Sequence, residues 1–412
     1  MTSRSHSSSS GTAPKPGPAG RHTVEEHQEH IRALLEPLDD RPSQILLPRA
    51  AVGRTLAENV YSPIDLPVFR NSAMDGYAVA AESLAVLPAR LTVLGIVGAG
   101  ADYGDPVPAG AAVKLMTGAP LPPNTDCVVP VEDTDTDGAA VIIRTPRSAG
   151  DFVREPGTDI RRGMLLARAG TVLEPKHAAA LAAAGVAGVP VRRRIDAAVI
   201  TTGNELIRPG LELGPGQIYD SNGVALATAL EANGTQVRMV AHSSDDPNEF
   251  RRLLDVAFDS AQVVFTTGGI SMGDFEVVRQ TLSPLGGEFG HVAVQPGGPQ
   301  GTTVINGVPV LSFPGNPVSA LVSFHVFARE VLRDLAGLAE IGPRTLPVGT
   351  VLRSPAGKRQ FQRGRLVDGG VEPVAGPGSH LIATMARADV LIDIPAETTS
   401  VPAGADVRVW PI

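Results

Sequence analysis

Three glycine- and hydroxyl-rich turns lie between residues 201 and 320, and each directly follows an apolar, strand-like run. They read TTGNEL (201–206), TTGGISMGDFE (266–276) and SFPGNPVSA (312–320). Glycines let the backbone approach a ligand closely, and N–H groups at a following helix N-terminus bind negative charge. The pattern predicts a pocket for a phosphorylated, anionic ligand at one edge of an α/β sheet.

Carboxylates accompany the first of these turns. Glu205 belongs to it, and Asp220 and Ser221 precede the next expected helix in IYDSNG. A carboxylate beside a phosphate site suits a bridging Mg²⁺, because this ion prefers oxygen ligands. Helix capping explains these residues equally well, so both interpretations stay open at this point.

The second and third turns differ in how specific they are. The second holds more glycines, hydroxyls and acids than a tight turn needs, which favours phosphate binding over a purely structural turn. In the third, Gly315, Asn316 and Pro317 suit a helix start. Ser319 is therefore the candidate ligand contact there.

Three loops nearer the N-terminus carry further oxygen donors. PVFRNSAMDGYAV, MTGAP and EPGTDI supply Asp75, Thr117 and Asp159. By itself the Asp75–Gly76 pair is a plain turn signal. Sequence physics alone gives no reason for these residues to meet the anion pocket.

Composition narrows the class of protein. The 412 residues are 43% hydrophobic and 19% charged, which is typical of a soluble globular chain of about three domains. A net charge of −8 disfavours general nucleic-acid binding. Cys127 is the only cysteine, and its apolar setting indicates a buried thiol rather than a nucleophile. The chain lacks long apolar runs and an apolar signal segment, so we expect a cytoplasmic protein without membrane contact.

The order of patterns predicts an α/β multidomain fold. Residues 1–20 are expected to form a disordered tail, and Thr23-x-x-Glu26 is a capping box that starts a helix. Residues 21–45 plus 151–192 are expected to form a discontinuous domain, in which the second part packs on the N-terminal helix. Residues 46–150 should form a β-rich domain. Residues 193–340 should form an α/β domain with a central parallel sheet, and residues 341–412 a small β-barrel-like domain.

Six motifs in order carry a family resemblance: NSAMDGYAV, MTGAP, TTGNEL, IYDSN, GGISMGD and PGNPVSA. From about Thr23 to the C-terminus the chain resembles the molybdopterin molybdenumtransferases, the family of MoeA and the gephyrin E-domain. The resemblance implies molybdenum cofactor biosynthesis: insertion of molybdate into adenylylated molybdopterin with Mg²⁺ and release of AMP. It also implies a homodimer with a shared site, and a molybdopterin adenylyltransferase as the donor of the substrate.

The resemblance also assigns roles to residues. Catalytic roles fall to Asp75, Thr117, Asp159, Glu205, Asp220, Asp274 and Glu276, of which Glu205, Asp220 and Asp274 are the expected metal ligands. Cofactor-binding roles fall to Thr202, Gly203, Ser221, Gly268, Gly269, Ser271, Gly273, Gln295, Pro314, Gly315, Asn316, Ser319, Arg363 and Ser379. Arg363 in KRQFQRGR and Ser379 in GPGSHL are the expected donors to the molybdate oxyanion.

One loop departs from the family pattern. HVAVQPGGP places His291, Gln295 and Gly298 where the family commonly has lysines, and Glu276 stands where the family often has Asp. Two functions therefore remain: an active transferase, or a degenerate paralogue that binds molybdopterin or acts as a scaffold without inserting metal. The retained acids and glycines favour the enzyme. A different phosphate-handling enzyme would leave the N-terminal motifs unexplained.

Overall fold

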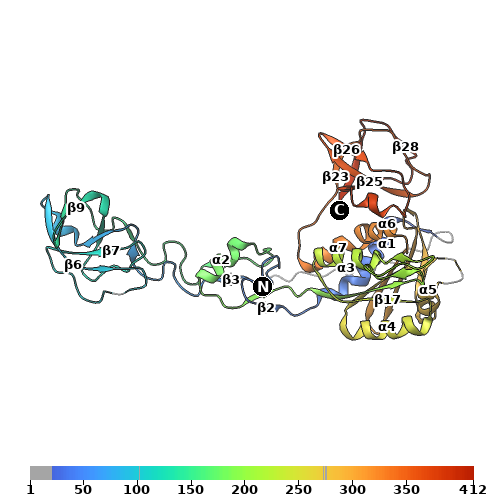
Figure 1. The fold of residues 1–412 in the computed structure, drawn as a ribbon, viewed down its shortest axis with the longest axis horizontal. Coiled ribbons are helices and arrows are strands. Elements are labelled where there is room, and N and C mark those ends of the chain that lie inside the picture. Colours follow the sequence, from blue (N-terminus) through green and yellow to red (C-terminus); the bar gives the residue numbers. More distant parts are fainter. Residues whose placement is uncertain (1–20, 102, 272, 274–275) are drawn as a thin grey trace, which may run out of the picture. The chain divides into compact units, whose positions relative to one another are not determined.

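The computed structural model describes residues 21–101, 103–271, 273 and 276–412, which form two compact units (Figure 1). The larger unit joins residues 21–42 with Arg193–Ile412, and the smaller unit is Ser43–Arg192. The tail expected over residues 1–20 lies outside the described residues. In the part of the chain that is described, no helix is long and apolar enough to cross a membrane.

A seven-stranded sheet organises the larger unit, in the order β1-β19-β21-β22-β18-β14-β17. Its strands are β1 (Arg21–His22), β14 (Ile195–Thr202), β17 (Thr235–Ser243), β18 (Val263–Thr267), β19 (Glu288–Val292), β21 (Pro299–Ile305) and β22 (Val308–Phe313). The four strands β22, β18, β14 and β17 are parallel, which confirms the predicted α/β core. β21 runs antiparallel to both neighbours, so one edge of the sheet is mixed.

Helices cover both faces of this sheet, which explains the continuous apolar strands. All eight residues of β14 are buried, and alternate side chains enter different cores. Val199 packs in the core that holds α3, α6 and α7, whereas Ile200 packs with α4 and α5. The helices are α3 (Asn222–Ala232), α4 (Pro247–Ser260), α5 (Val277–Leu282), α6 (Pro317–Ser323) and α7 (Arg329–Ala336).

Helix α1 (Val24–Leu35) begins at the predicted capping box, with Thr23 and Glu26 each accepting the other's backbone N–H. Ile31 and Leu35 are fully buried in the same core as α6 and α7. This packing differs from the prediction that residues 151–192 pack on the N-terminal helix. In the structure that segment pairs within the smaller unit, where β13 (Val189–Val191) joins β2 (Gln44–Leu46).

The smaller unit is β-rich. A six-stranded sheet has the order β8-β5-β7-β6-β10-β9, with β5 (Gly76–Val79), β6 (Ala89–Val97), β7 (Ala111–Leu115), β8 (Cys127–Pro130), β9 (Thr134–Asp137) and β10 (Ala140–Ile143). A separate core holds α2 (Pro175–Ala183) through Leu181, together with Leu56 and Val191.

A second six-stranded sheet forms the C-terminal region, residues 341–412. Its strands are β20 (Val294–Gln295), β23 (Arg344–Pro347), β25 (Arg359–Val367), β26 (Gly370–Pro373), β27 (Val390–Ile394) and β29 (Asp406–Pro411). β20 comes from the loop between β19 and β21 and pairs with β25. A strand borrowed from the central part of the chain therefore ties the two sheets of the larger unit together.

The position of α1 can be tested with the single tryptophan, Trp410, which lies in the same core as Ile31. Ile31→Ala should lower the free energy of the unfolding transition reported by Trp410 fluorescence by about 2–5 kcal/mol, because it leaves a cavity in that core. Leu173→Ala, a cavity in the smaller unit's core, should leave this transition unchanged. The reverse pattern in urea titrations would mean that α1 packs with the smaller unit.

Candidate functional site

The three predicted turns come together at the carboxyl ends of β14, β18 and β22. Gly268 follows β18 with a φ of +91°, and its N–H donates to the Phe313 carbonyl at 3.2 Å. A Cβ at position 268 would lie 2.7 Å from the Thr202 carbonyl oxygen, and one at Gly315 would lie 3.2 Å from the Gly268 Cα. The turns therefore touch through backbone atoms, with no room for side chains between them.

Asn222, the first residue of α3, fixes two of these turns to each other. Its Nδ2 donates to the Thr267 hydroxyl at 3.0 Å and to the Gly315 carbonyl at 2.7 Å. Thr267 in turn donates to the Pro314 carbonyl at 2.9 Å. The side chain is buried, so these bonds are shielded from water.

A cavity of about 1120 Å³ opens over the three turns. Most cofactor-binding residues predicted from the sequence line it: Thr202, Gly203, Ser221, Gly268, Gly269, Ser271, Gln295, Pro314, Gly315, Asn316, Ser319 and Ser379. Glu205, Asp220 and Glu276 line it as well. Gly273 lines a smaller adjoining hollow, and Asp274 lies outside the described residues.

The carboxylates of the cavity differ in what already binds them. Asp220 accepts from the Thr201 hydroxyl at 2.7 Å and from the Gly223 N–H at 3.0 Å, so it caps α3. Glu205 has no hydrogen-bond donor among the residues that the structure describes. Glu205 lines the cavity, so its carboxylate can bind a cation or a hydrogen-bond donor of a ligand.

Glu276 binds its own loop. Its two oxygens accept from the Ser271 N–H at 2.7 Å and the Gly273 N–H at 3.3 Å. Ser271 and Gly273 were predicted to bind the ligand. In the structure they neutralise an internal carboxylate instead, so a phosphate bound there would have to displace Glu276.

A metal ion would find oxygen donors here but few of them within the described chain. No cluster of three or more His, Cys, Asp or Glu side chains suited to a metal occurs among the described residues. Glu205 and Asp220 both line the cavity, and Mg²⁺ commonly uses one or two carboxylates together with substrate phosphates and water. The donor chemistry therefore fits Mg²⁺.

Lys358 is the one Lys or Arg side chain among the described residues that line the cavity. It directly precedes β25, and the Arg359 N–H donates to the Ala293 carbonyl at 2.9 Å. Arg359 itself is engaged elsewhere, because its guanidinium binds both oxygens of Asp393. Two consecutive residues thus differ in role: Arg359 is bound within the protein, whereas Lys358 lines the cavity.

Glutamines stand beside this lysine. Gln360 pairs with Gln295 in register, and its Nε2 donates to the Gln295 Oε1 at 2.7 Å. Gln362 donates to the Gln360 Oε1 at 2.7 Å. This chain of amides orients Gln295, whose NH₂ group has no acceptor among the described residues, so it can donate to an anion without carrying charge.

Arg363 binds the turn that carries Ser379, and the two side chains are not both exposed to the cavity. The buried Arg363 guanidinium donates to the carbonyls of Gly376 and, at 3.0 Å, Gly378. Arg363 does not line the cavity, whereas Ser379 does, and the Ser379 carbonyl accepts from the Val318 N–H at 3.1 Å. Arg363 therefore holds the turn that presents Ser379.

The N-terminal candidates lie in the smaller unit. Thr117 donates both its N–H, at 2.6 Å, and its hydroxyl, at 2.7 Å, to the Asp75 Oδ1, and these bonds lower the pKa of Asp75. Asp159 is exposed on another loop, where its N–H donates to the Leu66 carbonyl. Cys127 is fully buried and burial raises its pKa to about 12, which agrees with an inert thiol.

Sequence reasoning missed several lining residues. Asp245 and Asn204 join by two reciprocal backbone-to-side-chain bonds at the end of β17. The rule that identified the other turns, polar residues directly after a parallel strand, applies equally to HSSDDP at this strand end. Asn222 carried no comparable signal, because its partners Thr267 and Gly315 are distant in sequence.

Comparisons with known proteins agree with this architecture. Family models match in three stretches: the MoeA N-terminal region (domain I and II) over residues 22–185, a probable molybdopterin binding domain over 198–334, and the MoeA C-terminal region (domain IV) over 345–412. These matches define a protein of the MoeA class.

Relatives are similar over nearly their whole length. Molybdopterin molybdenumtransferase 2 of Mycobacterium tuberculosis is 40% identical, over 94% of this chain and 99% of the relative. The Haemophilus influenzae molybdopterin molybdenumtransferase is 32% identical, over 88% and 92%. A molybdopterin biosynthesis MoeA structure from Pyrococcus horikoshii has a TM-score of 0.77 at 33% identity, covering 95% of this chain and 99% of the other. The chain belongs to the molybdopterin molybdenumtransferase family and is a transferase.

Proposed function

We propose that this chain acts in molybdenum cofactor biosynthesis, inserting molybdate into adenylylated molybdopterin in the presence of Mg²⁺ and releasing AMP. The observation that carries the proposal is the cavity over the three turns, which is lined by both the Lys358 ammonium and the Glu205 carboxylate, a group without a donor in the described part of the chain. A carboxylate suits a metal ion that binds phosphate, and an ammonium suits an oxyanion. A molybdopterin adenylyltransferase would supply the substrate.

The reaction needs no covalent intermediate with the protein. Once molybdate is bound, an oxygen of water forms a bond to the adenylyl phosphorus and releases its proton to solvent, the P–O bond of the anhydride breaks, and the pterin phosphate leaves with the electron pair. Molybdate then forms two Mo–S bonds with the pterin dithiol, and one molybdate oxygen leaves as water with the two thiol protons. The protein positions the reactants and balances their charge.

Glu205 and Asp220 would hold Mg²⁺. When bound, this ion supplies positive charge to the phosphate oxygens of the substrate. The cavity needs this positive charge, because its described lining has four acidic side chains and one lysine. The acids are Glu205, Asp220, Asp245 and Glu276. An anionic substrate would be repelled from this space without added positive charge.

Lys358 would compensate for the lysines that the loop 291–299 lacks. Pairing of β20 with β25 places the start of β25 beside Gln295 in this loop. Gln295 contributes an uncharged donor next to it. The expected positive charge therefore comes from the C-terminal sheet rather than from the loop.

The activity itself is the first test. Protein supplied with adenylylated molybdopterin should release AMP when molybdate and Mg²⁺ are added, and Glu205→Gln should lower the rate by at least about 100-fold because the free carboxylate is lost. Glu212→Gln, an exposed acid outside the cavity, is the matched control. Tight molybdopterin binding without molybdate-dependent AMP release would contradict the proposal and indicate a binding protein.

The charge compensation has its own test. Lys358→Gln should raise the KM for molybdate by about tenfold or more, because one ammonium contact to the oxyanion is lost. Adding Gly298→Lys should restore part of the affinity, since a Cβ at position 298 meets its nearest neighbours at 3.6 Å. Arg344→Gln controls for net charge, because this residue is exposed and does not line the cavity. An unchanged KM in Lys358→Gln would exclude this role.

A homodimer with a shared site would give the smaller unit its part in the reaction. This unit exposes large apolar side chains, among them Ile45 at 65% and Leu47 at 67%, which is typical of a surface covered by another chain. Asp75 and Thr117 form an exposed acidic group on the same unit. We infer that this group completes the cavity of a second copy.

Complementation distinguishes a shared site from a site within one subunit. Asp75→Ala and Glu205→Gln should each be inactive alone, whereas their co-expressed mixture should recover about one quarter of the wild-type rate, because half of the dimers hold one intact site. Isolated heterodimers of wild type with the double variant should be inactive for a shared site and about half active otherwise. Two differently tagged subunits allow these heterodimers to be purified and assayed.

A further inference from the structure

Arg329 is the largest fully buried side chain of the chain's described part, with 2% exposure. It begins α7, directly after the π-helical turn η5 (Phe324–Ala328). Burying a guanidinium costs free energy unless its N–H donors are hydrogen-bonded. The acceptors of Arg329 therefore show which parts of the protein it connects.

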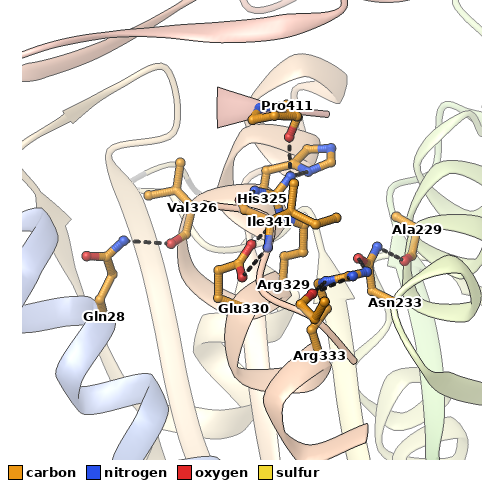
Figure 2. Close-up of polar contacts among 11 residues, drawn as sticks. Gln28, Ala229, Asn233, His325, Val326, Arg329, Glu330, Arg333, Ile341 and Pro411 are labelled. Atoms are coloured by element: carbon orange, nitrogen blue, oxygen red, sulfur yellow. Dashed lines mark hydrogen bonds and ion pairs between the residues drawn. The ribbon is translucent and has the colours of Figure 1, made fainter. Parts of the chain in front are cut away.

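All three nitrogens of this guanidinium are engaged (Figure 2). Nε donates to the Glu330 Oε1 at 2.9 Å, Nη2 donates to the Ile341 carbonyl at 3.3 Å, and Nη1 donates to the Pro411 carbonyl. Glu330 also binds Ile341, because its Oε2 accepts from the Ile341 N–H at 3.2 Å. Ile341 and Pro411 are the first and the penultimate residue of the C-terminal region.

His325 supports this arrangement from the preceding turn. Its Nδ1 lies 3.2 Å from the Arg329 Nη1, and since a guanidinium can only donate, Nδ1 is the acceptor. Burial and the adjacent Arg329 charge lower the pKa of His325 to about 3, so the ring is neutral at physiological pH. The Arg329 contacts therefore hold without any titration near neutrality.

The helix that carries Arg329 also reaches the cavity. α6, η5 and α7 follow one another without a break, and Asn316, Pro317 and Ser319 at the start line the cavity. Arg329 lies ten residues beyond Ser319, about 15 Å along the helix. The continuous helical segment α6–η5–α7 thus lines the cavity at its N-terminal end and binds the C-terminal region through Arg329 farther along.

At the cavity, the C-terminal region joins the rest of the larger unit through backbone bonds. The Val318 N–H donates to the Ser379 carbonyl at 3.1 Å, and the Arg359 N–H donates to the Ala293 carbonyl at 2.9 Å. The first bond is made by Ser379 itself, and the second by the residue that directly follows Lys358. Their geometry depends on where the C-terminal region is anchored.

We propose that Arg329 is a positioning residue: by binding both chain ends of the C-terminal region, it holds Lys358 and Ser379 over the cavity. It does not touch a ligand, and it acts through the placement of the sheet that carries these two residues. The consequence for molybdate rests on the function proposed above. The consequence for the backbone bonds at the cavity does not.

Hydrogen exchange tests the placement independently of activity. Arg329→Met, which keeps the side-chain bulk but removes every donor, should speed exchange of the Val318 and Arg359 amides by about tenfold or more, with β14 and β18 unchanged. Arg329→Lys keeps one donor group and should give a smaller effect. Arg333→Met is the matched control, because Arg333 binds Asn233 and Ala339, outside residues 341–412. Unchanged exchange at both amides, or an equal rise in β14, would overturn the proposal.

Kinetics test the consequence for the site. Arg329→Met should raise the KM for molybdate by about tenfold while the KM for adenylylated molybdopterin changes less than about twofold, since the α/β side of the cavity stays in place. Faster exchange with an unchanged KM for molybdate would also overturn the positioning role. If wild-type protein releases no AMP on addition of molybdate, the proposed function fails, and the exchange result alone decides the role of Arg329.

Discussion

The site depends on the close approach of three backbone turns at the carboxyl edge of one sheet. Gly268 leaves no space for a Cβ against Thr202, and Gly315 lies directly against Gly268. Parallel pairing of β14, β18 and β22 brings these strand ends to one edge, and Asn222 then ties the turns together. The floor of the cavity is consequently backbone, which neither bends away nor changes rotamer when an anion binds.

This floor carries more negative than positive charge, and the rest of the larger unit compensates in two ways. Local N–H groups satisfy Glu276 and Asp220, so only part of the acidic charge faces a ligand. The C-terminal sheet adds Lys358, while the hydrogen-bonded glutamines Gln295 and Gln360 supply polarity without charge. Positive charge at the site is thus a property of domain arrangement rather than of one loop.

Periodicity and turn chemistry predicted much of this fold because those signals are local. The capping box at Thr23 and the parallel sheet of the α/β domain were both readable from patterns within a few residues. The antiparallel edge formed by β19 and β21 was not, since an alternating strand has no direction of its own. The core that receives α1 was not readable either, because an amphipathic helix indicates that it packs but not against which partner.

Side-chain roles were less predictable than positions for a physical reason. A polar group near a cavity can bind a ligand or the protein, and the choice depends on donors that fold next to it. Arg363 was expected at the molybdate, yet its guanidinium binds the turn that presents Ser379. Glu205 and Glu276 are both acids of glycine-rich turns, yet only Glu276 has N–H donors within its own loop.

Arg329 is a polar side chain whose hydrogen bonds all go to the protein and none to the cavity. Burying a charge seldom adds stability, because the desolvation penalty offsets most of what the new bonds contribute. The benefit of such a residue is orientation, since a planar guanidinium donates to carbonyl oxygens only at set angles. The Arg329 guanidinium donates to two carbonyls of the C-terminal region that lie 70 residues apart in sequence, those of Ile341 and Pro411. An apolar side chain could fill that space and preserve the core, but it would not fix how the two sheets of the larger unit face each other across the cavity.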